Sequence, residues 1–199
     1  MKKAFYVLTI VASVCLYACG GKGGSSNASA DAQKQEAATT EKMTINDADW
    51  VETDLSSVSS MTPVLVRLPK DAKMEKNGNG GVDIKIGNSY MLTVSNLASS
   101  SVKEAMDSDK SLTVNTKSGY KNQKTEMDEA MGFVYTYQMN DEANGTTYEP
   151  ESHFFAYVEK DGAIYSIKDD KQSFDVKNSF FTADMAKQVY GIVKSMKVK

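Results

Sequence analysis

The chain has 199 residues, with 26 acidic and 23 basic side chains and a formal net charge of −3 at pH 7. A mildly acidic chain offers no basic face to a nucleic-acid backbone, so nucleic-acid binding is excluded. Apolar and aromatic residues continue from Ile45 to the end of the sequence. That length of about 155 residues is the size of one domain.

The chain begins with a short cationic segment, Met1–Lys3, and an uncharged, mostly apolar run follows over Ala4–Leu16. This run is shorter than the roughly 20 residues of a membrane-spanning helix, and it has the length of a signal-peptide hydrophobic region. The tetrapeptide Leu16-Tyr17-Ala18-Cys19 comes next, and it resembles the lipobox of bacterial lipoproteins. The resemblance implies that residues 1–18 are a removed signal peptide and that Cys19 is the lipid attachment site.

The chain contains two cysteines, Cys15 and Cys19. Cys15 would be removed with the signal peptide, and the lipobox resemblance implies that the sulfur of Cys19 carries a diacylglyceryl group. The mature domain would then hold no disulfide and no cysteine-ligated metal. Two or more acyl chains hold a protein firmly at a membrane, at about 0.8 kcal/mol per buried methylene. We therefore expect the membrane to be a partner of this protein through its lipid anchor.

Residues 19–45 contain the acylated cysteine and a segment rich in Gly, Ser, Ala, Thr, Gln and Lys. Such a composition cannot bury enough surface to fold, so we expect a flexible tether with a span of roughly 25–30 Å. Gly20 takes the place of the aspartate that retains lipoproteins in the inner membrane, and the first acidic residue is Asp31. We expect an outer-membrane anchor with the domain facing the periplasm, and exposure at the cell surface is the open alternative.

Residues 46–199 are expected to form a single globular domain that begins with strands. Pro63–Pro69 is a short apolar run closed by prolines, and Lys76–Gly81 is a cluster of turn residues. Val82–Ile86 alternates apolar and polar side chains, which is the pattern of a half-buried strand. Gly87-Asn88 suits a hairpin turn into a further strand over residues 89–95.

The pattern then changes to that of a helix, because Ser101 and Glu104 have the spacing of a capping box. This helix is expected to end near Ser111. Two strands are expected next, over Lys121–Met127 and Met131–Met139.

The last part of the chain predicts a hairpin and a helix. Asp161-Gly162 is a strong turn signal between two aromatic and β-branched runs that extend from His153. Thr182 is the expected N-cap of the closing helix, whose apolar stripe runs to Met196. Three lysines are expected at the end of this helix, where they favour its dipole: Lys194, Lys197 and Lys199.

This order of elements predicts an α+β fold, with an antiparallel sheet of about five to seven strands and two or more helices packed on it. Val64–Met74, the hairpin and helix that follow, the aromatic strand pair and the closing helix together resemble the Mog1/PsbP-like fold. The resemblance covers roughly residues 50–199. It implies a fold and no function, since one fold serves many functions.

The sequence shows no recognisable catalytic set, and we expect no catalytic residue, no cofactor and no metal. The only histidine, His153, follows Ser152, but neighbours in a strand point to opposite faces. A single histidine without a free cysteine excludes a conventional zinc site. Calcium binding by the acidic loops is left open, although their spacing is not that of an EF-hand. The acidic residues concerned are Asp47, Asp49, Asp141, Glu142, Glu149 and Glu151.

Aromatic side chains are concentrated in the two expected strand pairs. Phe133, Tyr135 and Tyr137 share one face of a strand, and cross-strand core packing explains most of the aromatic residues. The alternative is a partly exposed aromatic surface that binds a partner. Its candidate residues are Phe154, Tyr157 and Tyr165.

These features together predict a membrane-anchored bacterial lipoprotein that acts as a non-enzymatic accessory or binding module in the cell envelope. Its expected partner is an envelope protein. One alternative is a lipid-tethered carrier of a small molecule, which needs a pocket lined by aromatic side chains. The other is a small hydrolase with a carboxylate site.

Overall fold

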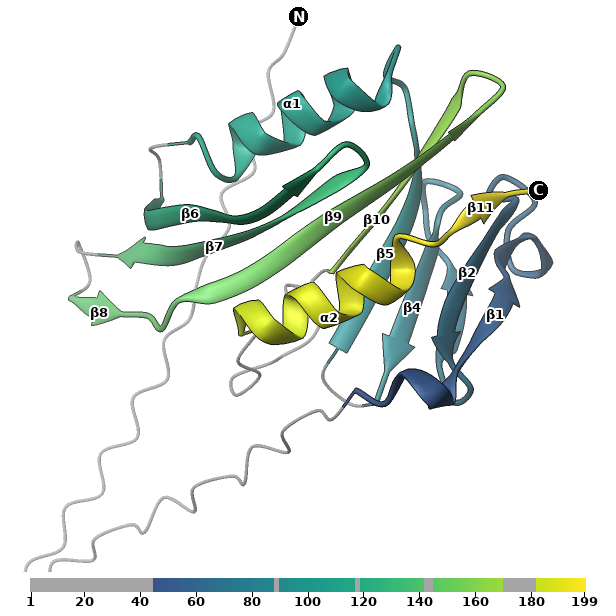
Figure 1. The fold of residues 1–199 in the computed structure, drawn as a ribbon, viewed down its shortest axis with the longest axis horizontal. Coiled ribbons are helices and arrows are strands. Elements are labelled where there is room, and N and C mark those ends of the chain that lie inside the picture. The colour runs from purple at the N-terminus through teal and green to yellow at the C-terminus, as the bar shows by residue number, and fades with distance from the viewer. Residues whose placement is uncertain (1–44, 88–89, 117–118, 142–144, 170–181) are drawn as a thin grey trace, which may run out of the picture. The chain divides into compact units, whose positions relative to one another are not determined.

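The computed structural model of the protein describes residues 45–199 except 88–89, 117–118, 142–144 and 170–181 (Figure 1). The expected signal peptide and the expected lipid attachment site, Cys19, lie outside these residues. The expected tether also lies outside them, apart from Ile45. Asn88 of the expected hairpin turn is likewise not described.

The described elements include eleven strands, two α-helices and two short 3-10 helices. The strands are β1 (Trp50–Asp54), β2 (Val64–Pro69), β3 (Lys73–Lys76), β4 (Val82–Ile86), β5 (Tyr90–Leu97), β6 (Tyr120–Glu129), β7 (Gly132–Asp141), β8 (Thr146–Thr147), β9 (Glu151–Lys160), β10 (Ala163–Asp169) and β11 (Lys197–Val198). The helices are α1 (Val102–Leu112), α2 (Ala183–Val193), η1 (Asp47–Asp49) and η2 (Leu55–Ser57).

The described residues have the expected α+β fold. The larger sheet follows the order β3-β4-β5-β10-β9-β7-β6, with the two-residue strand β8 beside β7. A smaller sheet has the order β1-β2-β11. Neighbouring strands pair antiparallel in both sheets. The predicted strands of residues 63–69, 82–86, 89–95, 121–127, 131–139 and the 153–169 hairpin are confirmed, with boundaries shifted by a few residues.

Each α-helix begins where its capping residue predicts. Ser101 accepts a hydrogen bond from the Glu104 backbone N–H at 3.1 Å, and the Glu104 carboxylate accepts one from the Ser100 backbone N–H at 2.8 Å. The capping box is therefore present, with its return contact displaced by one residue. Thr182 caps α2 through the Met185 backbone N–H. No helix in the described part of the chain is long and apolar enough to cross a lipid bilayer.

The part of the larger sheet that β7 and β9 form is covered on both faces, and both strands are apolar on both sides. α2 lies over one face, and Val134, Phe154 and Ala156 belong to the core that includes its apolar residues. α1 lies over the other face, where Phe133, Tyr135, Phe155 and Tyr157 form a second core with Val102 and Ala105 (Figure 1). The inward side chains of β2 join the first core, so the small sheet packs against the same interior.

The end of the chain differs from the expectation of a long closing helix. α2 ends at Val193, and Lys197 and Val198 form β11, which pairs with β2. The prediction that Lys197 and Lys199 lie at the helix end is wrong, and the Lys199 ammonium contacts the Asp54 carboxylate at 2.7 Å. Met196 is buried beyond the helix. It therefore continues the apolar spacing of α2 although the backbone has left the helical conformation.

Gly132 is a point where the sheet and α2 leave no room for a side chain. Its φ is 156°, and a Cβ atom there would lie 2.6 Å from the Tyr190 ring and against the Phe155 carbonyl. Gly191 in α2 is exposed, and a Cβ atom there would meet nothing within 4 Å. The two glycines therefore form a matched pair for substitution.

We expect Gly132→Ala to lower the free energy of unfolding by about 1–3 kcal/mol, because the new methyl group overpacks this contact. We expect Gly191→Ala to raise it by about 0.5–1 kcal/mol, because alanine favours a helix interior. Urea denaturation of the full-length chain followed by circular dichroism measures both values. Equal effects of the two substitutions would contradict this description of the β7–α2 contact.

Candidate functional site

The three candidate binding residues lie in the interior. Phe154 and Tyr165 belong to the core under α2, whereas Tyr157 belongs to the core under α1, and all three are buried. The sheet thus separates them, and the structure does not bring them together on one surface. Their positions fit core packing, the main interpretation of the aromatic residues, and not the alternative of an exposed binding surface. Tyr157 donates a hydrogen bond to the Asp109 carboxylate at 2.6 Å, and burial, reinforced by that carboxylate, raises the pKa of the Tyr157 hydroxyl.

Ser152 and His153 lie on opposite faces of β9, as the strand pattern predicts. The Ser152 hydroxyl is 2.7 Å from the Thr136 hydroxyl, its cross-strand neighbour. His153 lies on the other face, where its ring meets those of Tyr135 and Tyr137. The two side chains therefore form no serine–histidine pair.

His153 instead lies between two buried carboxylates, and we call Glu151, His153 and Asp169 the acid–histidine cluster. Its Nδ1 is 3.1 Å from Asp169 Oδ2, and its Nε2 is 3.5 Å from Glu151 Oε2. The other carboxylate oxygen of Asp169 accepts a hydrogen bond from the Phe154 backbone N–H at 3.2 Å. All three side chains are buried.

The charges of this cluster decide the protonation state of the histidine. Burial by itself lowers the pKa of His153, but Asp169 and Glu151 together outweigh that effect and raise the pKa to about 9. The ring is therefore an imidazolium at neutral pH and makes an ion pair with each carboxylate. Removing one partner of a buried ion pair leaves an uncompensated charge and costs about 3–5 kcal/mol.

Strand geometry assembles the cluster. Glu151 and His153 are two residues apart in β9, so their side chains share a face. Asp169 is the last residue of β10, and the β9–β10 pairing brings it beside Phe154. The sequence pattern did not predict that two carboxylates flank His153. Strand alternation alone predicts that Glu151 lies on the same face as His153. The position of Asp169 beside His153 depends on the register of the β9–β10 hairpin, which alternation does not specify.

A second feature lies where β6 begins and β7 ends, and we call Tyr120, Tyr137 and Met139 the distal aromatic patch. Tyr120 is directly opposite Met139 in the β6–β7 pairing, so their side chains share a face with Tyr137. The rings of Tyr120 and Tyr137 meet edge to face, with centroids 4.5 Å apart. The two rings are half-buried, and the Met139 side chain is 41% exposed.

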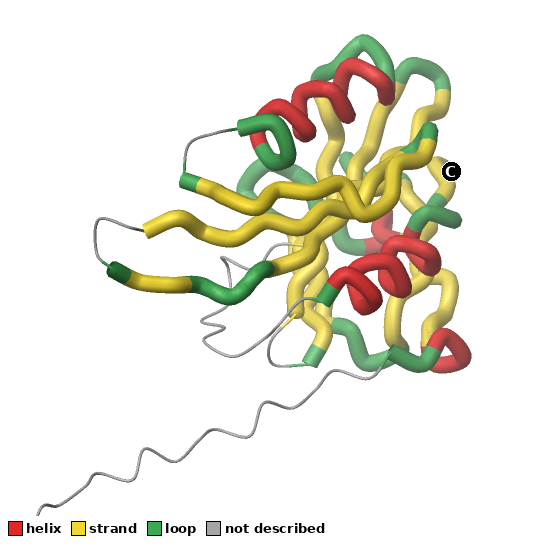
Figure 2. The backbone as a smooth tube through the Cα atoms, turned by 60° about the vertical axis from the view of Figure 1, so that its left-hand side comes forward, coloured by secondary structure: helices red, strands yellow, loops and turns green. Residues whose placement is uncertain are grey.

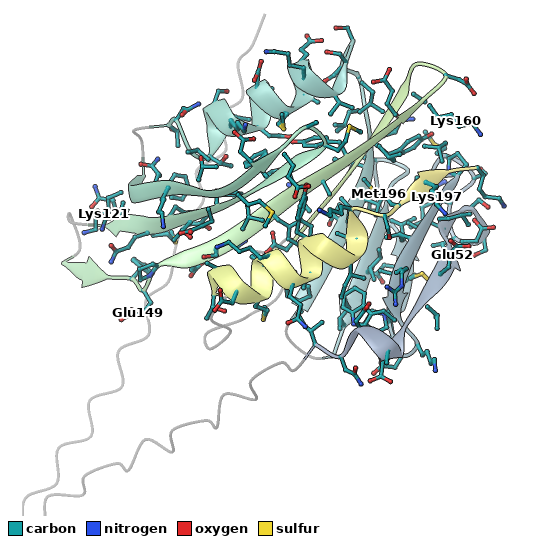
Figure 3. All side chains as sticks on the ribbon, in the orientation of Figure 1. Glu52, Lys121, Glu149, Lys160, Met196 and Lys197 are labelled. Carbon is teal, nitrogen blue, oxygen red and sulfur yellow. The ribbon has the colours of Figure 1, made fainter. Side chains whose placement is uncertain are left out.

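The distal aromatic patch lies at the end of the sheet away from the smaller sheet. β7 and β8 end beyond both α-helices in two views of the domain (Figures 1 and 2). Lys121 follows Tyr120 and marks this end in Figure 3, whereas Glu52 of β1 lies at the opposite side of the domain.

Two of the acidic residues that were left open for calcium, Asp47 and Asp49, are paired with neighbouring side chains. Asp47 contacts Arg67 at 2.7 Å, and the Asp49 carboxylate accepts a hydrogen bond from Asn46. Among the residues that the structure describes, no three or more His, Cys, Asp and Glu side chains are arranged to hold a metal ion. Glu142 lies outside the described residues, so calcium binding by the 140–152 loop stays untested.

Comparison with known proteins does not identify the chain. No protein-family model matches it, and no curated protein matches its sequence.

The acid–histidine cluster predicts how stability depends on pH. The pKa of His153 is about 9 in the folded protein, whereas an ordinary histidine, as in the unfolded chain, has a pKa of 6.5. Protonation therefore stabilises the fold fully below pH 6.5, and this contribution is lost as the pH rises through 9. We expect the unfolding free energy to fall by a few kcal/mol over this interval, because one pKa unit corresponds to about 1.36 kcal/mol.

The variant His153→Gln cannot take up this proton. Comparing it with the unsubstituted protein therefore isolates the contribution of His153 to the pH dependence of the unfolding free energy. We expect the difference in unfolding free energy between the two full-length proteins to shrink between pH 6.5 and 10 in urea denaturation experiments. A constant difference across that interval would show that His153 does not hold a proton in the folded protein.

Proposed function

We propose that this protein is a lipid-anchored, non-enzymatic docking module of the bacterial cell envelope. The tetrapeptide Leu16-Tyr17-Ala18-Cys19 supports the anchor. The observation that carries the docking role is the distal aromatic patch, in which an exposed methionine adjoins two half-buried tyrosines. The partner is an envelope protein with an apolar surface that covers Met139 and Tyr120.

The composition of the patch is that of an interface centre. Tyrosine and methionine are enriched in protein–protein interfaces relative to the rest of a protein surface, whereas lysine and glutamate are depleted. The tyrosine rings lose little conformational freedom on binding, because each is already held against a neighbouring ring. Polar residues lie around the apolar centre, among them Lys121, Asn122 and Asn140. An apolar centre with a polar rim is typical of a docking surface.

The location of the patch also supports docking. It lies at the far end of the β6–β7 hairpin, where β7 extends beyond both α-helices and away from the small sheet (Figure 2). The patch is built on two paired strands, which fix its side chains better than a loop does. A tether of about 25 residues gives the domain a reach of roughly 25–30 Å from the lipid surface.

The structure gives less support to the small-molecule carrier. That function requires an aromatic-lined pocket, but the aromatic side chains under α1 pack on one another. The rings of Phe133 and Phe155 stack with centroids 5.2 Å apart, and Val102 and Ala105 of α1 lie in the same core. The hydrolase alternative requires accessible carboxylates, whereas Glu151 and Asp169 are buried and paired with His153.

The anchor is tested by replacing the lipidated cysteine. We expect Cys19→Ala to abolish the incorporation of labelled fatty acid and to stop processing of the signal peptide, because the thiol is the acylation site. Cys15→Ala is the matched control and should retain both. Labelling that persists in the Cys19→Ala protein would refute the anchor and leave the docking role to stand on its own evidence.

The docking role is tested with two methionines of the same hairpin. Met139 is 41% exposed in the distal aromatic patch, and Met131 is 39% exposed at the β6–β7 turn. We expect Met139→Glu to reduce partner capture at least tenfold, because a carboxylate at the centre of an apolar interface must be desolvated. Met131→Glu should leave capture unchanged.

The measurement is quantitative mass spectrometry of proteins cross-linked to the full-length chain in its own envelope, with each variant compared with the unsubstituted protein. Circular dichroism shows whether both variants remain folded. Equal capture by the Met139→Glu and Met131→Glu proteins, or no protein captured above background by any of them, would overturn the docking role of this patch.

A further inference from the structure

The acid–histidine cluster and the distal aromatic patch are joined by a continuous row of side-chain contacts. Asp169 of β10 contacts His153 of β9 at 3.1 Å. The His153 ring stacks on the Tyr137 ring of β7, with centroids 5.2 Å apart and planes 11° apart. Tyr137 in turn meets Tyr120 of β6 at 4.5 Å. The row crosses four neighbouring strands and leads from a buried ion pair to the surface.

The orientation of the His153 ring is not the one that strand pairing alone favours. His153 is directly opposite Tyr135 in the β7–β9 register, and Glu151 is opposite Tyr137. The imidazole nevertheless lies closer and more nearly parallel to the diagonal neighbour, Tyr137, than to Tyr135, which is 5.8 Å away at 36°. Glu151, which is opposite Tyr137 in the register, has its carboxylate 3.5 Å from the Nε2 atom of this ring.

We infer that His153 is a positioning residue for the distal aromatic patch, and that the charge on its ring sets the orientation of Tyr137 and, through it, of Tyr120. The inference rests on the proposed docking role of that patch. The physical basis is twofold. A cation within about 6 Å of an aromatic centroid is attracted to the ring face, and the two ion pairs hold the imidazolium under Tyr137 only while it is charged.

Several titratable groups face His153 or its partners from the strands packed around it. They are Glu151 on β9, Asp169 on β10, Tyr135 and Tyr137 on β7, and Tyr90 on β5, which interacts electrostatically with Asp169. Burial raises the pKa of the Tyr90 and Tyr135 hydroxyls well above 10. These two groups therefore stay neutral over the interval in which the imidazolium loses its proton.

The test is a pH titration of the full-length chain by NMR, with 13C in the histidine Cε1 and the tyrosine ring carbons. Tyrosine signals are assigned with single Tyr→Phe variants. Between pH 6 and 10 we expect the Tyr137 and Tyr120 ring signals to shift with the midpoint of the His153 signal, near 9. Tyr165, which is buried in the other core, is the control and should not follow that midpoint.

Ring signals of Tyr137 and Tyr120 that stay constant while His153 titrates would overturn the inference, as would an equal shift at Tyr165. A variant then checks the cause. In Asp169→Asn we expect the histidine and both tyrosine midpoints to fall together by about 1–3 units, because the variant lacks the neighbouring opposite charge. If that variant does not fold, Glu151→Gln serves instead. Tyrosine midpoints that stay in place while the histidine midpoint falls would also overturn the inference.

This experiment separates the two proposals. In one outcome, the Tyr137 and Tyr120 signals follow the His153 midpoint, but Met139→Glu does not change partner capture. That outcome would remove the docking role and leave His153 as the residue that orients the two rings. Capture that is lost in Met139→Glu, with tyrosine signals that ignore His153, would keep the docking role and remove the positioning role.

Discussion

The pairing of β7 with β9 is the constraint on which the rest of this structure depends. Both strands carry apolar or aromatic side chains on both faces, so neither face can be left in water. α1 and α2 satisfy this requirement from opposite sides, and each provides its own core. A shift of one residue in the β7–β9 register would exchange the two sets of side chains between the faces. The register thus specifies the cores, the cluster around His153 and the approach of both helices.

Two charged contacts reinforce this arrangement from the sides. Glu129 of β6 accepts a hydrogen bond from Tyr190 and lies 2.9 Å from the Lys194 ammonium. This contact ties the β6–β7 turn to the C-terminal end of α2. Lys110 of α1 contacts Asp128 of the same turn region at 2.7 Å. The hairpin is therefore fastened near its turn, and its other end carries the aromatic patch.

Much of the fold could be predicted from the sequence because local patterns specify most elements. Period-two alternation marked β4 and β5, a capping residue marked each α-helix, and Asp161-Gly162 marked the β9–β10 hairpin. The short strands β1, β3 and β11 carry no such pattern. β3 is almost wholly polar, and the Lys197-Val198 pair has no alternation that can be counted. These strands form because the strand beside each of them offers backbone groups for pairing. Such pairing depends on the tertiary structure and cannot be predicted from a local sequence pattern.

The site was less predictable for the same reason. Tyr120 meets Met139 only after two irregularities in the β6–β7 register, one of them beside Asn122, whose φ is 55°. Such bulges cannot be counted from residue types alone. The aromatic residues that were the candidates for the alternative of a binding surface, Phe154, Tyr157 and Tyr165, belong to the best-packed strands. High aromatic content indicated the core there, whereas the patch contains fewer aromatic residues at the ends of two strands.

The β9–β10 turn has a further consequence for the order in which the molecule assembles. Asp161 and Gly162 both adopt positive φ, 53° and 78°, and they join two long strands with a two-residue connection. Closing so short a loop costs little chain entropy, whereas β5, the other neighbour of β10, ends at Leu97 and is far away along the chain. We expect this hairpin to be an early folding unit, in which local contacts set the approach of Asp169 to His153. The other strands would then pair with the edges of the β9–β10 hairpin after the charges of His153 and Asp169 are already paired.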